Sequence, residues 1–126
     1  MQFSSTLQGA RILIVEDEFL LAIDLTDRLK REGCEVIGPA SRESKALAVL
    51  ERDRPDAVVL DLNLDGKLPI DLAEVLAARQ IPFVVVTGYG NRRLDVPTLQ
   101  EAPRLDKPVK IQDLVRILSD LLGTTH

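Results

Sequence analysis

The sequence is poor in the residues on which several protein classes depend. It has one cysteine, one tyrosine, three phenylalanines and no tryptophan among 126 residues. A single cysteine excludes an internal disulfide and a cysteine-based zinc site, and it favours a reducing, cytoplasmic setting. The chain has 16 Lys and Arg residues and 20 Asp and Glu residues, which gives a formal charge of −4. This negative charge predicts no nucleic-acid partner. The longest apolar runs have five residues, against about 20 for a membrane span, so no membrane insertion is expected.

What the chain does contain is three short apolar runs without alternation, which is typical of strands buried on both faces. They cover residues 12–15, 57–60 and 83–86 and are rich in β-branched side chains. Two more polar segments, 35–38 and 104–106, are typical of strands at sheet edges. Successive strands begin 21 to 26 residues apart, enough for one helix in each connection. The pattern predicts five βα units.

The connecting segments carry apolar side chains at helical spacing. Helices are expected over residues 19–31, 42–52, 69–79 and 111–122. The connection at 91–101 loses this period and contains Pro97, so a short or irregular helix is expected there. Strand order 2-1-3-4-5 places every apolar strand inside the sheet and every polar one at an edge. The predicted fold class is therefore α/β, a flavodoxin-like doubly wound (βα)5 fold with a parallel five-stranded sheet.

Polar side chains follow the strands at the rim where such sheets bind ligands. Glu16 and Asp17 follow the first strand, and Asp61 ends the third. Thr87 ends the fourth strand, and Lys107 follows the fifth. Each alone has an ordinary explanation as a helix cap, a turn residue or a surface side chain. Their convergence on one rim predicts a functional site.

The chemistry of this set points to magnesium and phosphate. Carboxylates gathered together repel one another, which raises their pKa values unless a metal ion intervenes. Mg²⁺ prefers one or two carboxylates with water and a phosphate, and Glu16 or Asp17 together with Asp61 would suit it. Lys107 and the Thr87 hydroxyl would then contact phosphoryl oxygens. Asp61, in the middle of the sheet, is the expected nucleophile that forms an acyl phosphate.

These residues resemble the receiver domain of bacterial response regulators, and the resemblance covers residues 9–122. It implies that Mg²⁺ is bound by Glu16, Asp17 and Asp61. The backbone carbonyl of Asn63 is a further ligand in that family. The resemblance also implies that Asp61 accepts a phosphoryl group from a histidine kinase or a phosphotransfer protein, with slow autodephosphorylation. Such a domain signals through contacts with a downstream protein and is no enzyme toward other substrates.

Residues 82–89 resemble the motif of a receiver subgroup called FATGUY, with two valines where the motif has Phe and Ala. The subgroup implies a stand-alone receiver in phosphorelay or stress signalling, served by a sensor kinase of the HWE type. In ordinary receivers an aromatic ring three residues before the lysine moves together with the threonine hydroxyl. Arg104 occupies that position here, so the expected switch residues are Thr87, Arg104 and Tyr89.

We expect residues 1–126 to form a single receiver domain. A receiver excised from a hybrid kinase or a multidomain regulator is an open alternative. A flavodoxin-like small-molecule binder fits less well, because its phosphate loop needs Ser, Thr or Gly where residues 16–18 are acidic. An aspartate-nucleophile phosphatase would need a substrate cap. A pseudo-receiver normally lacks the acids or the lysine that are present here.

Overall fold

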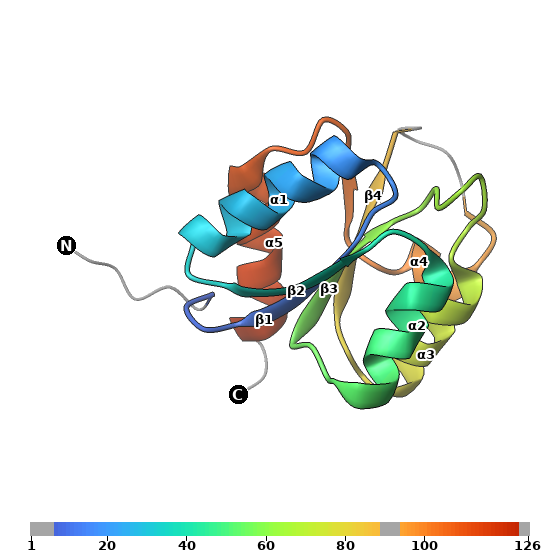
Figure 1. Cartoon of the computed structure of the whole chain (residues 1–126). Helices are drawn as coiled ribbons and strands as arrows, with labels where there is room; N and C mark the ends of the chain where they lie inside the picture. Colours follow the sequence, from blue (N-terminus) through green and yellow to red (C-terminus); the bar gives the residue numbers. More distant parts are fainter. Residues whose placement is uncertain (1–6, 89–93, 124–126) are drawn as a thin grey trace.

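The protein is built around one parallel sheet of five strands (Figure 1). The structure is a computed structural model that describes residues 7–88 and 94–123. The strands are β1 (Arg11–Val15), β2 (Glu35–Ala40), β3 (Ala57–Asp61), β4 (Phe83–Thr87) and β5 (Arg104–Asp106). Their order is β2-β1-β3-β4-β5, which confirms the predicted topology and the flavodoxin-like fold class.

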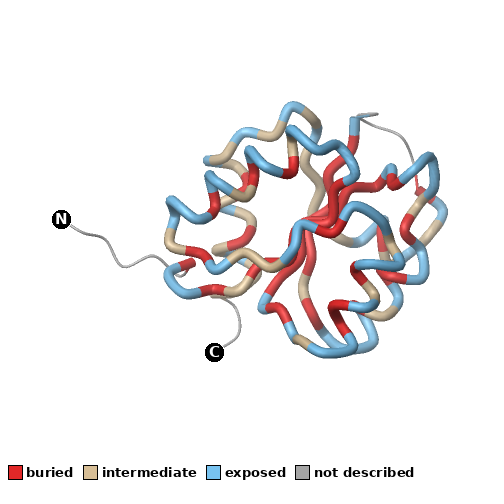
Figure 2. The backbone as a smooth tube through the Cα atoms, viewed as in Figure 1, coloured by how far each residue is buried: buried red, intermediate tan, exposed pale blue. Residues whose placement is uncertain are grey.

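Burial follows the polarity of the strands. Every residue of β3 and β4 is buried, and in β1 only Arg11 is partly exposed. The edge strands β2 and β5 are mostly half-buried or exposed. Figure 2 shows the buried segments crossing the centre of the molecule. The continuous apolar runs are thus central because only central strands are covered on both faces.

Helices cover both faces of the sheet (Figure 1). They are α1 (Phe19–Arg31), α2 (Glu43–Arg52), α3 (Ile70–Ala78), α4 (Pro97–Gln100) and α5 (Ile111–Gly123). Buried side chains of α1 and α5 share one core with the sheet, and those of α2, α3 and α4 share the other. The described part of the 91–101 connection holds only the four-residue α4, as its broken period predicts.

The edge strand β2 is longer than predicted, because it continues through Gly38 and Pro39 to Ala40. Pairing with β1 is irregular there, since Pro39 has no N–H to donate and an edge strand tolerates this loss. Gly38 has a φ of +91°, and a Cβ at this position would lie 2.8 Å from the backbone nitrogen of Ala40. The added length matters for the site, because the Ala40 carbonyl accepts the N–H of Glu16 at 3.0 Å.

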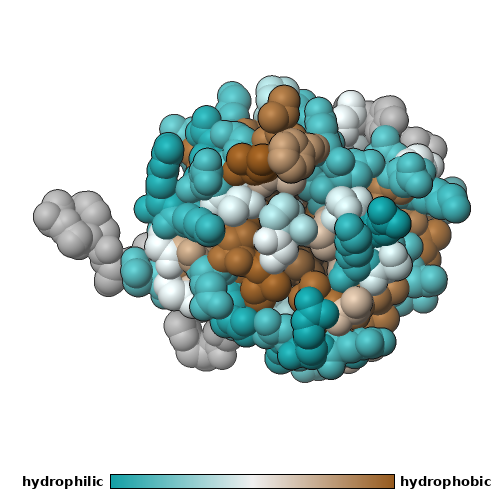
Figure 3. All heavy atoms as spheres, viewed as in Figure 1, coloured by the Kyte–Doolittle hydropathy of each residue, from teal (hydrophilic) through white to brown (hydrophobic). Residues whose placement is uncertain are grey.

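Figure 3 shows a largely hydrophilic face, with hydrophobic side chains at the surface near the start of α1 and around the edge strand β2. The exposed large apolar side chains include Phe19 and Leu20, at the start of α1. Within the two described ranges, no helix is both long and apolar enough to cross a membrane.

Candidate functional site

Three carboxylates meet at the carboxyl ends of β1 and β3. Glu16 and Asp17 come directly after β1, and Asp61 is the last residue of β3. One oxygen from each of the three lies within 4.8 Å of the others. Glu16 and Asp61 are only 3% and 2% exposed, whereas Asp17 is exposed to solvent. The structure therefore brings together the three acids that the sequence singled out.

Each of these carboxylates accepts a hydrogen bond from a backbone N–H. The donors are Glu18 to Glu16 at 3.0 Å, Asn63 to Asp61 at 3.1 Å and Asp65 to Asp17 at 3.0 Å. A hydrogen bond from the backbone restrains a carboxylate more firmly than one from a flexible side chain. The loop after β3 thus holds two of the three acids, through Asn63 and Asp65.

Lys107 extends over the same carboxylates from the end of β5. Its Nζ lies 3.4 Å from Asp61 Oδ2, 3.6 Å from Glu16 Oε2 and 3.7 Å from Glu18 Oε1. Its backbone N–H donates to the carbonyl of Thr87 at 2.8 Å, which ties the lysine to β4. Burial lowers the pKa of the ammonium, but the nearby carboxylates outweigh it and the pKa is raised overall. Lys107 is therefore a fixed positive charge beside Asp61.

Burial also perturbs Glu16. It raises the pKa of this carboxyl to about 8, with a further contribution from the neighbouring Asp61 and an opposing one from Lys107. Loss of hydration is a larger cause of this rise than the mutual repulsion of the acids that the sequence predicted. Without another cation, burial thus favours the neutral form of Glu16.

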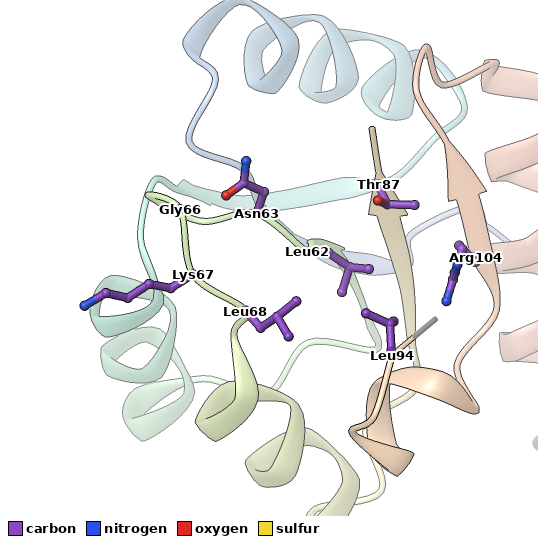
Figure 4. A pocket seen from close by; sticks show the side chains of 8 residues that line it. All are labelled: Leu62, Asn63, Gly66, Lys67, Leu68, Thr87, Leu94 and Arg104. Carbon is purple, nitrogen blue, oxygen red and sulfur yellow. The ribbon is translucent and has the colours of Figure 1, made fainter. Parts of the chain in front are cut away.

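A pocket of about 180 Å³ lies next to the acids, between the loop after β3 and strands β4 and β5 (Figure 4). It is lined by Leu62, Asn63, Gly66, Lys67, Leu68, Thr87, Leu94 and Arg104. The Thr87 hydroxyl faces this pocket, while the Lys67 side chain points away from it. The proposed switch residues Thr87 and Arg104 therefore share one pocket. The third, Tyr89, lies outside the described residues.

Two contributors had no role in the sequence argument. Glu18 belongs to the acidic run after the first strand, and only the fold shows that it reaches Lys107. Asp65 contributes its backbone N–H, which no side-chain pattern reveals. The sequence signal for the turn that places this N–H is the Asp65–Gly66 pair, since Asp-Gly is typical of a tight turn.

The donor set fits a hard divalent cation. All three acids present oxygen, the ligand atom that Mg²⁺ prefers. Three carboxylates against one ammonium also leave this group negatively charged when Glu16 is ionised. The exposure of Asp17 leaves one side of the cluster open to water.

Comparison with known proteins identifies the family. The model of the response regulator receiver domain matches residues 12–119, and the chain belongs to this family. PdtaR, a transcriptional regulatory protein of Mycobacterium tuberculosis H37Rv, is 37% identical over 109 residues, which are 83% of this chain and 53% of PdtaR. The phyllosphere-induced regulator PhyR of Methylorubrum extorquens is 31% identical over 117 residues, 90% of this chain and 44% of PhyR. The chain spans about half the length of these curated relatives.

Solved structures agree with this assignment. The receiver domain of the sensor histidine kinase PA1611 from Pseudomonas aeruginosa PAO1 is 27% identical, with a TM-score of 0.79. The match covers 92% of this chain and 99% of that one, whose structure has a magnesium ion coordinated in its active-site cleft. The chain is thus a two-component signalling domain, in a family for which phosphorylation and magnesium are typical.

Proposed function

We propose that Asp61 accepts a phosphoryl group from the histidine of a sensor kinase or a phosphotransfer protein, in a Mg²⁺-dependent reaction. One observation carries the proposal. Asp61 is buried at the end of a central strand, its Oδ2 lies 3.4 Å from an ammonium, and two more carboxylates lie within 4.8 Å. An acid in such a place is costly to bury unless cations neutralise it. In a Mg²⁺-dependent transfer of a phosphoryl group to Asp61, each of these groups has a role.

In the proposed transfer, an Asp61 oxygen attacks phosphorus as the bond between phosphorus and the histidine nitrogen breaks, and the imidazole leaves. Lys107 neutralises charge on a phosphoryl oxygen, and the Thr87 hydroxyl donates to another. Mg²⁺ held by Glu16, Asp17, Asp61 and the Asn63 carbonyl would supply further positive charge to the phosphoryl oxygens. Slow autodephosphorylation follows when water attacks phosphorus and the bond between phosphorus and the Asp61 oxygen breaks, which releases inorganic phosphate and restores the carboxylate of Asp61.

The surface beside the acids suits a protein phosphodonor. Phe19 and Leu20 are 73% and 77% exposed at the start of α1, directly after the acidic run. Large apolar side chains in contact with water favour a protein partner. We propose that a sensor kinase, of the HWE type implied by the FATGUY-like residues 82–89, contacts α1 while its phosphohistidine reaches Asp61.

The working unit that we propose is residues 1–126 as a single receiver domain that acts in the cytoplasm. The single five-stranded sheet of the described residues, covered by helices on both faces, supports the first part, and the free, buried thiol of Cys34 supports the second. Output would then pass to a downstream protein. Because the relatives are about twice as long, a receiver within a larger regulator is the alternative.

Phosphorylation by a small donor tests the central step. The full chain is incubated with acetyl phosphate and MgCl₂, and intact mass spectrometry is used to look for one added phosphoryl group. We expect the adduct in the wild type, its loss in Asp61→Asn or with a chelator, and its retention in Asp106→Asn, a matched control at the exposed end of β5. An adduct that persists in Asp61→Asn would contradict the proposal.

A further inference from the structure

The loop after β3 contains a tight two-residue turn beside the acids. Leu64 and Lys67 exchange two backbone hydrogen bonds of 3.0 Å each. The residues between them, Asp65 and Gly66, have φ values of +54° and +79°. Positive φ at both central positions is the geometry of a type I′ turn, for which Asp-Gly is a preferred sequence.

This turn is fixed to the core through Leu64 and contacts the acids through the next residue, Asp65. The side chain of Leu64 is 4% exposed and belongs to the core beneath α2 and α3. The N–H of Asp65 donates to Asp17 Oδ2 at 3.0 Å, across 48 positions of the sequence. Asp17 is the most exposed of the three acids, so it has the least surrounding protein to fix its orientation.

We infer that the turn at residues 64–67 is a positioning element for Asp17, and that Gly66 thereby sets the affinity of the site for Mg²⁺. The inference rests on the proposed Mg²⁺-dependent function. One oxygen of Asp17 accepts the N–H of Asp65, so the carboxylate is held in one orientation before the metal arrives. Partners that orient metal ligands in this way typically change metal affinity by about 10- to 100-fold when they are lost.

Gly66 is the residue through which the turn can be altered cleanly. A Cβ at this position would meet no atom within 4 Å, so a Cβ here acts through the strain of a positive φ and not through a clash. Alanine is strained in this region and valine more so, whereas asparagine tolerates it. The three substitutions therefore differ in how well they tolerate a positive φ, and none of them adds a clash at the Cβ position.

The chain offers a matched control at Gly9. This glycine has a φ of +78°, and a Cβ there would also meet no atom within 4 Å. It precedes β1, at the amino ends of the strands, whereas the acids lie at their carboxyl ends. Substitutions at Gly9 should cost similar stability and leave the metal site unchanged.

The experiment is calorimetric titration of MgCl₂ into the full chain, with urea unfolding of each variant to confirm that it is folded. We expect Gly66→Ala to bind Mg²⁺ about threefold more weakly and Gly66→Val about tenfold more weakly. Gly66→Asn and Gly9→Val should stay within about twofold of the wild type. If Gly66→Val does not fold, the comparison of Gly66→Ala with Gly66→Asn and Gly9→Ala decides the question.

Equal Mg²⁺ affinity for matched substitutions at Gly66 and Gly9 would overturn the inference, even if the wild type binds Mg²⁺ and is phosphorylated. So would a Gly66→Asn variant as weak as Gly66→Val, because affinity would then not follow the φ preference. A wild type that binds no Mg²⁺ would overturn the proposed function as well, which separates the two failures.

Discussion

The carboxyl group of Glu16 makes stability depend on pH at the scale of a single residue. Its pKa is about 8 in the folded protein, against an ordinary 4.5, chiefly because burial disfavours the charged form. Between these values the folded protein keeps a proton that the unfolded chain has lost. Without Mg²⁺, the stabilisation that comes from this bound proton is complete below the unfolded-state pKa of Glu16. It disappears as the pH rises through the folded-state pKa.

Glu16→Gln should therefore remove much of the fall in the free energy of unfolding with rising pH. Near pH 9 without Mg²⁺, we expect the variant to be more stable than the wild type by about 1–3 kcal/mol, with little difference near pH 5. Urea unfolding followed by circular dichroism measures the effect. Glu74→Gln, on the exposed side of α3, is the control and should leave the pH dependence unchanged. Parallel pH profiles for wild type and Glu16→Gln would contradict the prediction.

Cys34 is a second residue whose surroundings set its chemistry. It is 7% exposed, and burial, with a contribution from Glu32, raises the pKa of its thiol to about 11. Because the thiolate is the reactive form, labelling by a disulfide reagent near pH 8 should be roughly 100-fold slower in the native protein than in urea. Absorbance of the released thiolate follows the reaction. Native labelling as fast as that in urea would show that Cys34 is accessible.

At the site, side chains could be predicted from the sequence and backbone contacts could not. Asp61 ends an apolar central strand and Lys107 follows a more polar edge strand, and the order of the strands predicts the rim where the two side chains meet. The N–H of Asp65 carries no sequence signature of its own, because every residue except proline has one. Its role arises only from the turn that aims it at Asp17.

At the scale of elements, α2 and α3 satisfy each other's ends. Glu43, in the first turn of α2, accepts the N–H of Leu72 near the start of α3 at 2.9 Å. Near the other ends, Arg79 donates to the Leu50 carbonyl of α2 at 2.6 Å. The N–H groups at the start of a helix and the carbonyl groups at its end lack hydrogen-bond partners within the helix, so these two contacts replace ordinary caps.

We expect Glu43→Ala to lower the free energy of unfolding by about 1 kcal/mol, the usual cost of losing a helix cap. Glu43→Gln retains an acceptor and should recover most of this loss. Glu51→Ala, at an exposed position of the same helix, is the control. Urea unfolding measures all three, and a loss in Glu51→Ala as large as that in Glu43→Ala would assign the effect to α2 itself.

The elements themselves were largely predictable where one physical signal dominated. The apolar period of α1 predicts Phe19–Arg31, and the helix has these bounds. The end of β2 could not be predicted, because Pro39 ordinarily ends a paired strand. The strand continues past it only because an edge strand can lose one hydrogen bond and Gly38 adopts a positive φ.

At the scale of the whole molecule, strand order was predictable because burial decides it. The order 2-1-3-4-5 encloses all three apolar strands, and the sheet adopts that order. Strand order alone does not determine how strongly the site is coupled to global stability. That coupling depends on the carboxylates, which come from β3 and from the loop after β1 and meet only in the folded chain.

Mg²⁺ should therefore stabilise the entire fold by mass action, since the unfolded chain does not assemble its ligands. Each tenfold rise in free Mg²⁺ above the dissociation constant should add about 1.4 kcal/mol to the free energy of unfolding, a rise in Tm of about 5 °C for a domain of this size. Thermal unfolding across a MgCl₂ series measures the slope, with KCl at matched ionic strength as the control. Asp17→Asn should flatten the slope without changing the fold. An equal rise in Tm with KCl would mean that charge screening, and not a bound ion, stabilises the molecule.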